Sequence, residues 1–441
     1  MNQQGTIRLV SGGVTKDLGL APHICESGLM KNFDDATKTA FLEAATYVGT
    51  QNPVLTGYVG VRKEGAYVQT GKFNNFCTQI DCPHDFSSPE GLSSAQDLMQ
   101  YMNRVDALFP RTRMGAIQVQ KRLPVFHVHL VELGDGFAAY CIRLSHYVGD
   151  ATTLRLLEDQ LLARMVQEET GVVPPEIEWD EEAMSEVNVF LEYKKFPQGA
   201  TLRDRLAFPI AAAPPYIWSL LFPHRRRCHQ MLLSCAKIDR KKRELVRHNN
   251  DNDECSNDDK KHRYLSTYDV IVAALAQSKD LDSHVLYSCM SQRGRSHRRR
   301  RHQEQLQGEN DGEKSLGENM GGNLLLSRIL FQHECTDPNK VHRQHETTHE
   351  QHFRPGSIPW WSLLRGSASS ISSWRNLTAS SKKKKAMPDF VVCKNLPRSA
   401  FLSSPLDMIV ISQFDDQHIA VTYCKRKAID TTKGLLGELV A

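Results

Sequence analysis

The stretch that decides the fold reads Leu144-Ser145-His146-Tyr147-Val148-Gly149-Asp150-Ala151-Thr152-Thr153-Leu154. It follows an apolar run, 137–144, that predicts a strand, and it leads into apolar residues at helical spacing that predict a helix over 154–165. His146 would then lie in a glycine-containing turn at the end of a strand, where a cleft can reach it. Asp150 would begin the helix, where its carboxylate can accept backbone N–H bonds or pair with a cation. On spacing alone, a turn histidine followed by a helix cap is the more common explanation of this pattern.

The residues before this stretch predict a mixed α/β layer. Apolar residues at helical spacing over 40–48, behind Asp34 and Asp35, predict a helix. Short apolar segments bounded by glycine or proline predict four strands: Leu55–Arg62, Met114–Gln120, Phe126–Leu133 and Phe137–Leu144. Strands that alternate with packed helices are typical of an α/β fold.

The residues after it alternate between apolar elements and polar inserts. A cap at Ser266 to Asp269 predicts a helix over 270–276. Apolar runs predict five strands: His284–Met290, Asn323–Phe331, Asp389–Cys393, Met408–Phe414 and Ile419–Cys424. Polar stretches at 247–262, 293–319 and 334–387 have little to bury, and we expect them to be disordered. We therefore expect an N-terminal lobe over 1–190, a crossover over 191–262 and a C-terminal lobe over 263–441.

Composition narrows the classes of partner and compartment. The net charge is only +4 over 441 residues, which excludes a polybasic nucleic-acid coat, and we expect no nucleic-acid partner. An odd count of 11 cysteines and the polar start MNQQGTIRLV predict a cytoplasmic protein with free thiols.

The run 144–154 resembles the HxxxDG motif of the CoA-dependent acyltransferase superfamily. That superfamily includes the plant BAHD acyltransferases, chloramphenicol acetyltransferase and the condensation domains of peptide synthetases. Further segments resemble it in the same order along the chain: FLEAATYVGTQNPVLTGYV at 41–59, STYDVIVAAL at 266–275, SQRGR at 291–295 and GGN at 321–323.

The resemblance implies a two-lobed, chloramphenicol-acetyltransferase-like α/β fold with an active-site channel between the lobes. It implies acyl transfer from acyl-CoA to a small-molecule alcohol or amine, with His146 as the general base. Asp150 would be a structural anchor paired with an arginine from the second half, and Arg293 or Arg295 matches that position. No bound cofactor or metal is implied, and we expect a monomer.

Two departures from the superfamily pattern keep an alternative open. Ala151 stands where the family usually has glycine. The BAHD motif DFGWG is absent near the C-terminus, where 414–416 reads FDD. The alternative is a catalytically inactive member that acts as a binding or scaffold module.

Other motifs suggest rival sites. HETTH at 345–349 matches the zinc-protease pattern, but its polar surroundings argue against a buried metal helix. His127 and His129 share one face of a predicted strand, and Cys77, Cys82 and His84 lie close in sequence; neither set predicts a complete metal site. The basic runs at 293–301 and 382–385 are better read as solvated inserts than as nucleic-acid contacts.

The apolar segment Leu206–Pro223 holds four prolines, which argue against an uninterrupted membrane-spanning helix. Two interpretations stay open. The segment is either a buried crossover between the lobes or a peripheral membrane contact, with Tyr216 and Trp218 at the lipid interface. The pair Trp360 and Trp361 could add a second contact of that kind.

Overall fold

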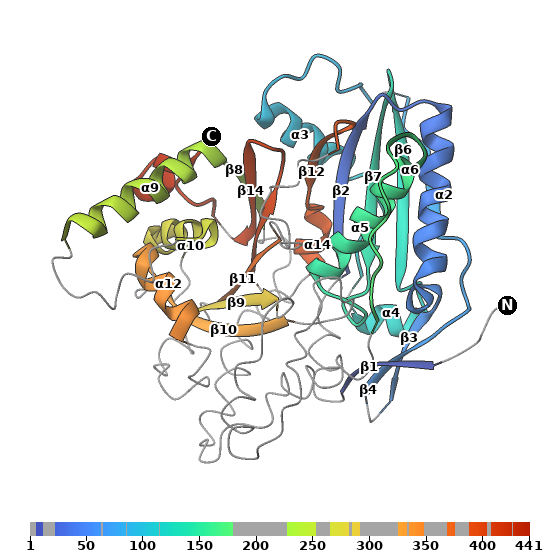
Figure 1. Cartoon of the computed structure of the whole chain (residues 1–441), viewed down its shortest axis with the longest axis horizontal. Coiled ribbons are helices and arrows are strands. Elements are labelled where there is room, and N and C mark those ends of the chain that lie inside the picture. The colour runs from blue at the N-terminus through green and yellow to red at the C-terminus, as the bar shows by residue number, and fades with distance from the viewer. Residues whose placement is uncertain are drawn as a thin grey trace.

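The structure is a computed structural model. The residues that it describes are 6–11, 23–62, 65–84, 86–113, 115–179, 227–252, 265–281, 285–291, 325–332, 335–347, 368–374, 388–403, 407–425 and 427–441. They fold around two large sheets, with a small third sheet beside the first (Figure 1).

The first large sheet has the strand order β12-β2-β7-β6-β5. Its strands are β2 (Ile24–Lys31), β5 (Cys77–Ile80), β6 (Phe126–Gly134), β7 (Phe137–Leu144) and β12 (Val391–Asn395). β5 and β6 are parallel and the other neighbours are antiparallel. The β6–β7 turn places Gly134, Asp135 and Gly136 at positive φ, which favours glycine and tolerates aspartate. In this strand order β7 is the central strand, with β2 on one side and β6 on the other.

Two helices cover one face of this sheet, α2 (Asp35–Gln51) and α5 (Ala151–Met165) (Figure 1). α2 begins where Asp34 caps it, because the Asp34 carboxylate accepts the Thr37 N–H at 2.8 Å. Phe41 of α2 is fully buried and its ring centroid lies 5.9 Å from that of Tyr140 in β7. Leucines of α5 extend the same core. The helix expected over 40–48 is confirmed, as are the strands over 126–133 and 137–144 and the helix over 154–165.

The opposite face of the first sheet packs toward the second sheet. α3 (Ala95–Val105) lies on this side, and α4 (Gly115–Lys121) comes later in the same lobe. Leu29 and Cys141 of the first sheet share a buried cluster with Leu232 and Ala420 of the second and with Phe414, which follows β13. The small sheet, in the order β1-β4-β3, is formed by β1 (Thr6–Ser11), β3 (Tyr58–Arg62) and β4 (Gly65–Gln69).

The second large sheet has the order β10-β9-β11-β13-β14-β8. Its strands are β8 (Arg227–Ser234), β9 (Val285–Ser291), β10 (Leu325–Phe331), β11 (Ala368–Ser373), β13 (Asp407–Gln413) and β14 (His418–Lys425). Around it lie α9 (Cys235–Asn252), α10 (Thr267–Gln277), α12 (Pro338–Thr347), α14 (Arg398–Ser403) and α15 (Gly434–Leu439) (Figure 1). α10 is almost wholly buried and starts with the expected capping box, in which Ser266 and Asp269 bond each other's backbone N–H.

β12 connects the two lobes. It comes from the C-terminal part of the chain, yet it pairs with β2 at the edge of the first sheet. Lys394 of β12 also donates its backbone N–H to the carbonyl of Phe414, which follows β13, at 2.7 Å. The structure does not test the lobe boundaries expected at 190 and 262, and they stay predictions.

Several expected elements differ from the structure. The segment 114–120 is expected to be a strand because it is short and bounded by glycine or proline, but 115–121 is helical. Its buried residues are Gly115 and Gln118, and Gln118 donates to the Arg113 carbonyl at 2.8 Å, a local contact that fits a helical turn and not a strand. The strand expected from Leu55 begins only at Tyr58, after a 3-10 helix over Pro53–Thr56.

Two of the inserts expected to be disordered also contain regular structure. α9 extends to Asn252, anchored by buried Ile238 and by a Lys241–Glu438 ion pair at 2.7 Å. Within 334–387, α12 buries Val341 against the second core, and β11 is a central strand with Ile371 fully buried. Long-range packing, which polar composition does not reveal, orders both. The insert at 293–319 lies outside the described residues.

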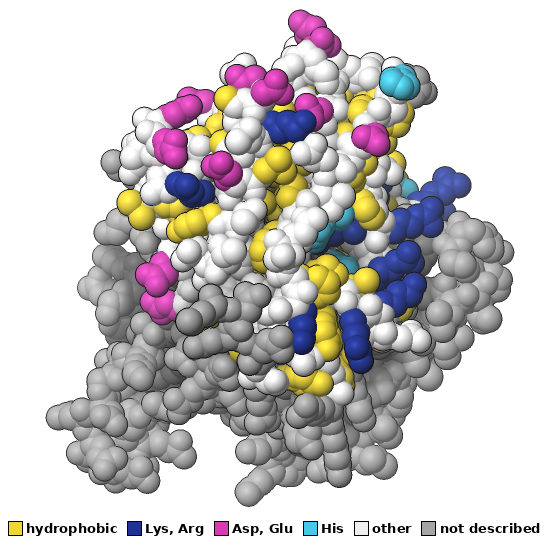
Figure 2. Space-filling view, turned by 90° about the vertical axis from the view of Figure 1, so that its right-hand side faces the viewer, with side chains coloured by type: hydrophobic (Ala, Val, Ile, Leu, Met, Phe, Trp, Pro, Cys, Tyr) yellow, Lys and Arg dark blue, Asp and Glu magenta, His cyan; other side chains and the backbone are white. Residues whose placement is uncertain are grey.

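Surface charge is unevenly distributed. On the face shown in Figure 2, lysine and arginine side chains gather along one side, and acidic side chains gather toward the top. In the part of the chain that the structure describes, no helix has the length and hydrophobicity needed to cross a membrane. The apolar segment 206–223 and the tryptophans at 360 and 361 lie outside the described residues, so their expected roles stay predictions.

Candidate active site

The candidate site begins where β7 ends. Leu144 is the last residue of β7 and lies opposite Ile24 of β2 and Phe126 of β6, so all three strands meet at one level. Ser145 then donates its backbone N–H to the Val125 carbonyl at 2.7 Å. The residues that follow, including His146, therefore leave the sheet at the C-terminal end of its central strand.

The turn that carries His146 is closed by backbone hydrogen bonds. The N–H groups of Val148 and Gly149 both reach the Ser145 carbonyl, at 2.9 and 3.3 Å. A Cβ on Gly149 would lie 2.7 Å from the Thr153 side chain and 2.8 Å from that of Leu144. Glycine at 149 is therefore required by close packing.

Asp150 is the N-cap of α5. It is fully buried, and one carboxylate oxygen accepts the Thr153 N–H at 3.0 Å and the Thr153 hydroxyl at 3.2 Å. Ala151 is the first helical residue, and it is not among the described residues with positive φ. An alanine fits here because the position has ordinary helical geometry, so the absence of a glycine at 151 does not distort this turn.

His146 is partly buried beside this cap. Burial lowers the pKa of His146, and it outweighs the opposing effects of backbone hydrogen bonds and of the Asp150 carboxylate. A histidine with a lowered pKa is neutral at pH 7, so its imidazole can accept a proton.

The arginines expected to pair with Asp150 cannot be located. Arg293 and Arg295 lie outside the described residues, and their pairing with Asp150 stays a prediction.

A cluster of polar side chains lies near His146, at the same end of the sheet. We call it the Arg143 cluster, and it consists of His23, His127, His129 and Arg143. Arg143 is opposite His127 in one neighbouring strand and Cys25 in the other. The rings of His127 and His129 lie 4.8 Å apart. Arg143 and His23 are each 7% exposed and His129 is 8% exposed, whereas His127 is partly buried.

The sequence pattern indicates two histidines of this cluster, His127 and His129, but not Arg143 or His23. A signal was present, because arginine is rarely buried and this one interrupts the apolar strand FAAYCIRL. His23 gave no comparable signal, since the strand that follows it, β2, was not expected.

The rival metal motifs do not form sites among the described residues. No group of three or more potential metal-ligating side chains occurs there. The motif at 345–349 begins in the last turn of α12 and runs beyond the described residues. Its neighbour His342 contacts Asp269 of the α10 capping box at 3.1 Å. Neither Cys77 nor Cys82 forms a disulfide, and burial raises the pKa of Cys77 to about 12, so Cys77 is a protonated thiol at pH 7.

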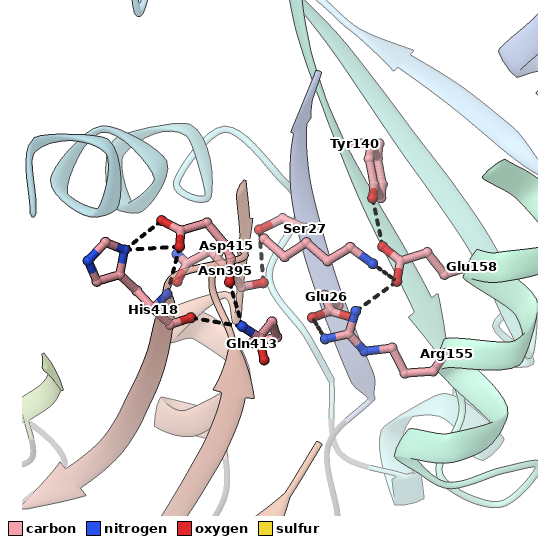
Figure 3. Close-up of polar contacts among 10 residues, drawn as sticks. Glu26, Ser27, Tyr140, Arg155, Glu158, Asn395, Gln413, Asp415 and His418 are labelled. Carbon is pink, nitrogen blue, oxygen red and sulfur yellow. Dashed lines mark hydrogen bonds and ion pairs between the residues drawn. The ribbon is translucent and has the colours of Figure 1, made fainter. Parts of the chain in front are cut away.

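A buried ionic network lies on the other face of the same sheet. Figure 3 shows Tyr140, Glu158, Arg155 and Glu26 directed toward one another. Arg155 lies 2.5 Å from Glu26 and 3.0 Å from Glu158, and Lys394 of β12 lies 2.6 Å from Glu158. The Tyr140 hydroxyl donates to Glu158 at 2.6 Å. This network joins β2, β7, α5 and β12.

Burial affects the two carboxyl groups of the network differently. Burial raises the pKa of Glu26 to about 8, although Arg155 opposes the effect. Burial would also raise the pKa of Glu158, but the cations Lys394 and Arg155 outweigh it and hold the value at about 2. Glu158 is therefore the firmly ionised member of the network.

A second polar group connects the two lobes. The buried carboxyl of Asp106 accepts from Ser27 and from the Asn395 amide, both at 2.6 Å.

The 414–416 segment turns between β13 and β14, where the Asp415 carboxylate lies 2.9 Å from His418 Nδ1 (Figure 3). Asp415 therefore stabilises a turn in the second lobe.

No protein-family model matches the sequence. A search of curated proteins likewise found no match.

Solved structures share the fold of this chain. One is TRI101 of F. graminearum, in a complex with coenzyme A and T-2 mycotoxin, with a TM-score of 0.56 and 14% identity over 96% of this chain and 95% of that one. Another is SgcC5 of Streptomyces globisporus, with a TM-score of 0.53 and 12% identity over 94% of this chain and 92% of that one. TRI101 of F. sporotrichioides, with coenzyme A and T-2, has a TM-score of 0.55 at 13% identity, over 99% of both chains. The expected two-lobed α/β fold is thereby confirmed.

Proposed function

We propose that the protein transfers an acyl group from acyl-CoA to a small-molecule alcohol or amine, with His146 as the general base. The observation that carries the proposal is the state of His146: it is a partly buried histidine in a tight turn at the end of a central strand, with a pKa lowered by burial. An imidazole kept neutral in this way is a proton acceptor at physiological pH.

The reaction needs one proton acceptor and no covalent enzyme intermediate. His146 removes the proton from the acceptor hydroxyl or amine as its oxygen or nitrogen attacks the thioester carbonyl. The tetrahedral intermediate then collapses, the carbon–sulfur bond breaks, and the protonated His146 returns its proton to the CoA thiolate. Protons and charges balance with no bound cofactor or metal.

Asp150 has a positioning role in this proposal. Its carboxylate is occupied by the Thr153 N–H and hydroxyl, so it fixes the start of α5 and the turn that holds His146. Its negative charge also favours the imidazolium that forms during proton transfer. An additional pairing with Arg293 or Arg295 belongs to the proposal.

The likeness in fold supports acyl-CoA as the donor, because the F. graminearum TRI101 structure holds coenzyme A. The same structure holds T-2 mycotoxin, and the SgcC5 structure holds an aryl ethanediol, so small organic molecules occupy this fold. We further expect the protein to act as a cytoplasmic monomer.

The test is a thiol-release screen that crosses short and long acyl-CoAs with alcohols and amines, with product masses measured in parallel. We expect thiol release that depends on an acceptor and matches an acylated product. An inactive binding module would bind acyl-CoA without acceptor-dependent release, and that result would overturn the proposal.

A further inference from the structure

Arg143 is a buried cation without a carboxylate partner. It is 7% exposed, and no ion pair joins it to any acidic side chain of the described residues. Its Nε and Nη2 atoms have no hydrogen-bond partner, and its guanidinium contacts the thiol of Cys141, a weak acceptor. Leaving a buried charged group unpaired is costly, so its presence requires a physical explanation.

The buried carboxyl of Asp106 does not supply the missing charge. Asp106 accepts hydrogen bonds from Ser27 and Asn395, and burial raises its pKa to about 7. Among the charged side chains, it is Arg398 and not Arg143 that lowers the pKa of Asp106. Arg143 therefore keeps a free edge while Asp106 is satisfied elsewhere.

The free edge has a specific shape. In a guanidinium, the N–H bonds of Nε and Nη2 point in parallel, and this edge matches the two oxygens of one carboxylate. Because both of these atoms lack a partner while the guanidinium contacts Cys141, the unpartnered edge of Arg143 is the edge that binds carboxylates in a bidentate manner.

The histidines around Arg143 add polarity without adding charge. Burial, followed by repulsion from Arg143, lowers the pKa of His23 and of His129 to about 3. The same two causes lower the pKa of His127. Nδ1 of both His127 and His129 also lacks a hydrogen-bond partner. At pH 7 the Arg143 cluster thus has one positive charge and two unused imidazole nitrogens, which suits a ligand with one negative charge.

The Arg143 cluster lies close to the proposed reacting group. Arg143 comes three residues before His146, and its side chain lies on the same face of β7 as Cys141, which packs toward the second sheet. A molecule held by Arg143 between the two sheets would therefore lie within reach of the turn that carries His146.

We propose that the Arg143 cluster binds a carboxylate of the acyl acceptor, so that the preferred acceptor is a hydroxy acid or an amino acid rather than a neutral alcohol or amine. This inference rests on the proposed function for the acyl transfer, but the anion site itself does not require turnover. The carboxylate pairs with Nε and Nη2 of Arg143, and His127 and His129 complete its hydrogen bonds.

The test measures binding without acyl transfer. Benzoate and its neutral isostere benzamide are titrated into the full-length protein by isothermal titration calorimetry at pH 7. We expect benzoate to bind about tenfold more tightly or better, because one bidentate ionic pair is worth at least this factor. We expect Arg143→Met to remove the preference and Arg143→Lys, which keeps the charge but loses the paired geometry, to retain only part of it.

Arg164→Met is the matched control, since Arg164 lies on α5 over the Tyr47 ring, away from the Arg143 cluster. It should keep the preference for benzoate. Equal binding of benzoate and benzamide by the wild-type protein, or an unchanged preference in Arg143→Met, would overturn the proposal. So would tighter binding of inorganic phosphate than of benzoate. His146→Ala should keep benzoate binding while it loses thiol release, which separates failure of this site from failure of the proposed function.

Discussion

His146 and Asp150 are four residues apart and have different tasks. His146 is neutral and partly exposed, whereas Asp150 is fully buried and bonded to Thr153. Both positions could be read from the sequence, because a strand, a glycine turn and a helix cap are local patterns. Arg143 could not be assigned in the same way, since its unpaired state depends on β2, β6 and Asp106, which are far apart in the chain.

The cap formed by Asp150 gives a prediction at this scale. Asp150→Ala should lower the free energy of unfolding by about 1 kcal/mol or more, the usual loss for an N-cap. It should also slow thiol release, because the turn that holds His146 loses its anchor. Asp150→Asn keeps a capping oxygen and should be less destabilised. Urea denaturation and the thiol-release rate are the measurements.

Asp34 provides the matched control for this substitution. It caps α2 through the N–H and hydroxyl of Thr37, just as Asp150 caps α5 through Thr153. Asp34→Ala should leave the thiol-release rate unchanged. Equal loss of activity in both alanine variants would show that Asp150 has no specific link to His146.

Among the elements, those with strong local periodicity were predicted and those ordered by distant packing were not. The helices over 35–51 and 267–277 and the β6–β7 hairpin follow their patterns. β11 did not, because its sequence ASSISS has little β propensity and it is held as a strand by β9 on one side and β13 on the other. α12 and the end of α9 were not predicted either. Their sequences are mostly polar, and only a few buried residues hold each helix in place, so neither has a clear apolar periodicity.

The buried ionic network gives a prediction at the scale of elements. Lys394→Met leaves Glu158 without one of its two cations, and loss of a buried partner typically costs about 3–5 kcal/mol of stability. The folded pKa of Glu158, about 2, is below its ordinary value of 4.5. This stabilisation is therefore present above pH 4.5 and is lost as the pH falls toward 2.

Urea denaturation of wild type and Lys394→Met at pH 7 and at pH 3 checks both parts. The difference between the two proteins should shrink at the lower pH. Lys38→Met is the control, because Lys38 forms an ion pair of the same 2.6 Å length with Glu132 at the surface. It should change stability little. A difference between wild type and Lys394→Met that does not depend on pH would contradict the assigned ionisation of Glu158.

At the scale of the whole molecule, the two lobes depend on each other. β12 forms an edge of the first sheet, and its Lys394 completes the ionic network under α5. The two sheets also share a buried cluster through Leu29, Cys141 and Phe414. The resemblance in sequence predicted two lobes, but the return of the C-terminal segment to the first sheet has no local signal because it is a pairing over more than 350 residues.

A fragment containing residues 1–190 should therefore be less stable than the same lobe in the full chain. It lacks β12, so the β2 edge is unpaired and Glu158 loses Lys394. We expect the fragment to unfold at a lower urea concentration than the full-length protein, or to precipitate when expressed alone. Coincident urea midpoints for the fragment and the full chain would contradict this dependence.

The central claim is that His146 is the base of an acyl transfer, and thiol release by His146→Ala tests it most directly. The rate is measured with an acyl-CoA and acceptor on which the wild-type protein is active, and His84→Ala, at an exposed loop histidine, is the control. Far-UV circular dichroism confirms that both variants are folded. We predict that His146→Ala loses acceptor-dependent thiol release by a factor of about 100 or more, the contribution typical of a general base, while His84→Ala keeps the wild-type rate. Wild-type turnover by a folded His146→Ala protein would contradict the account.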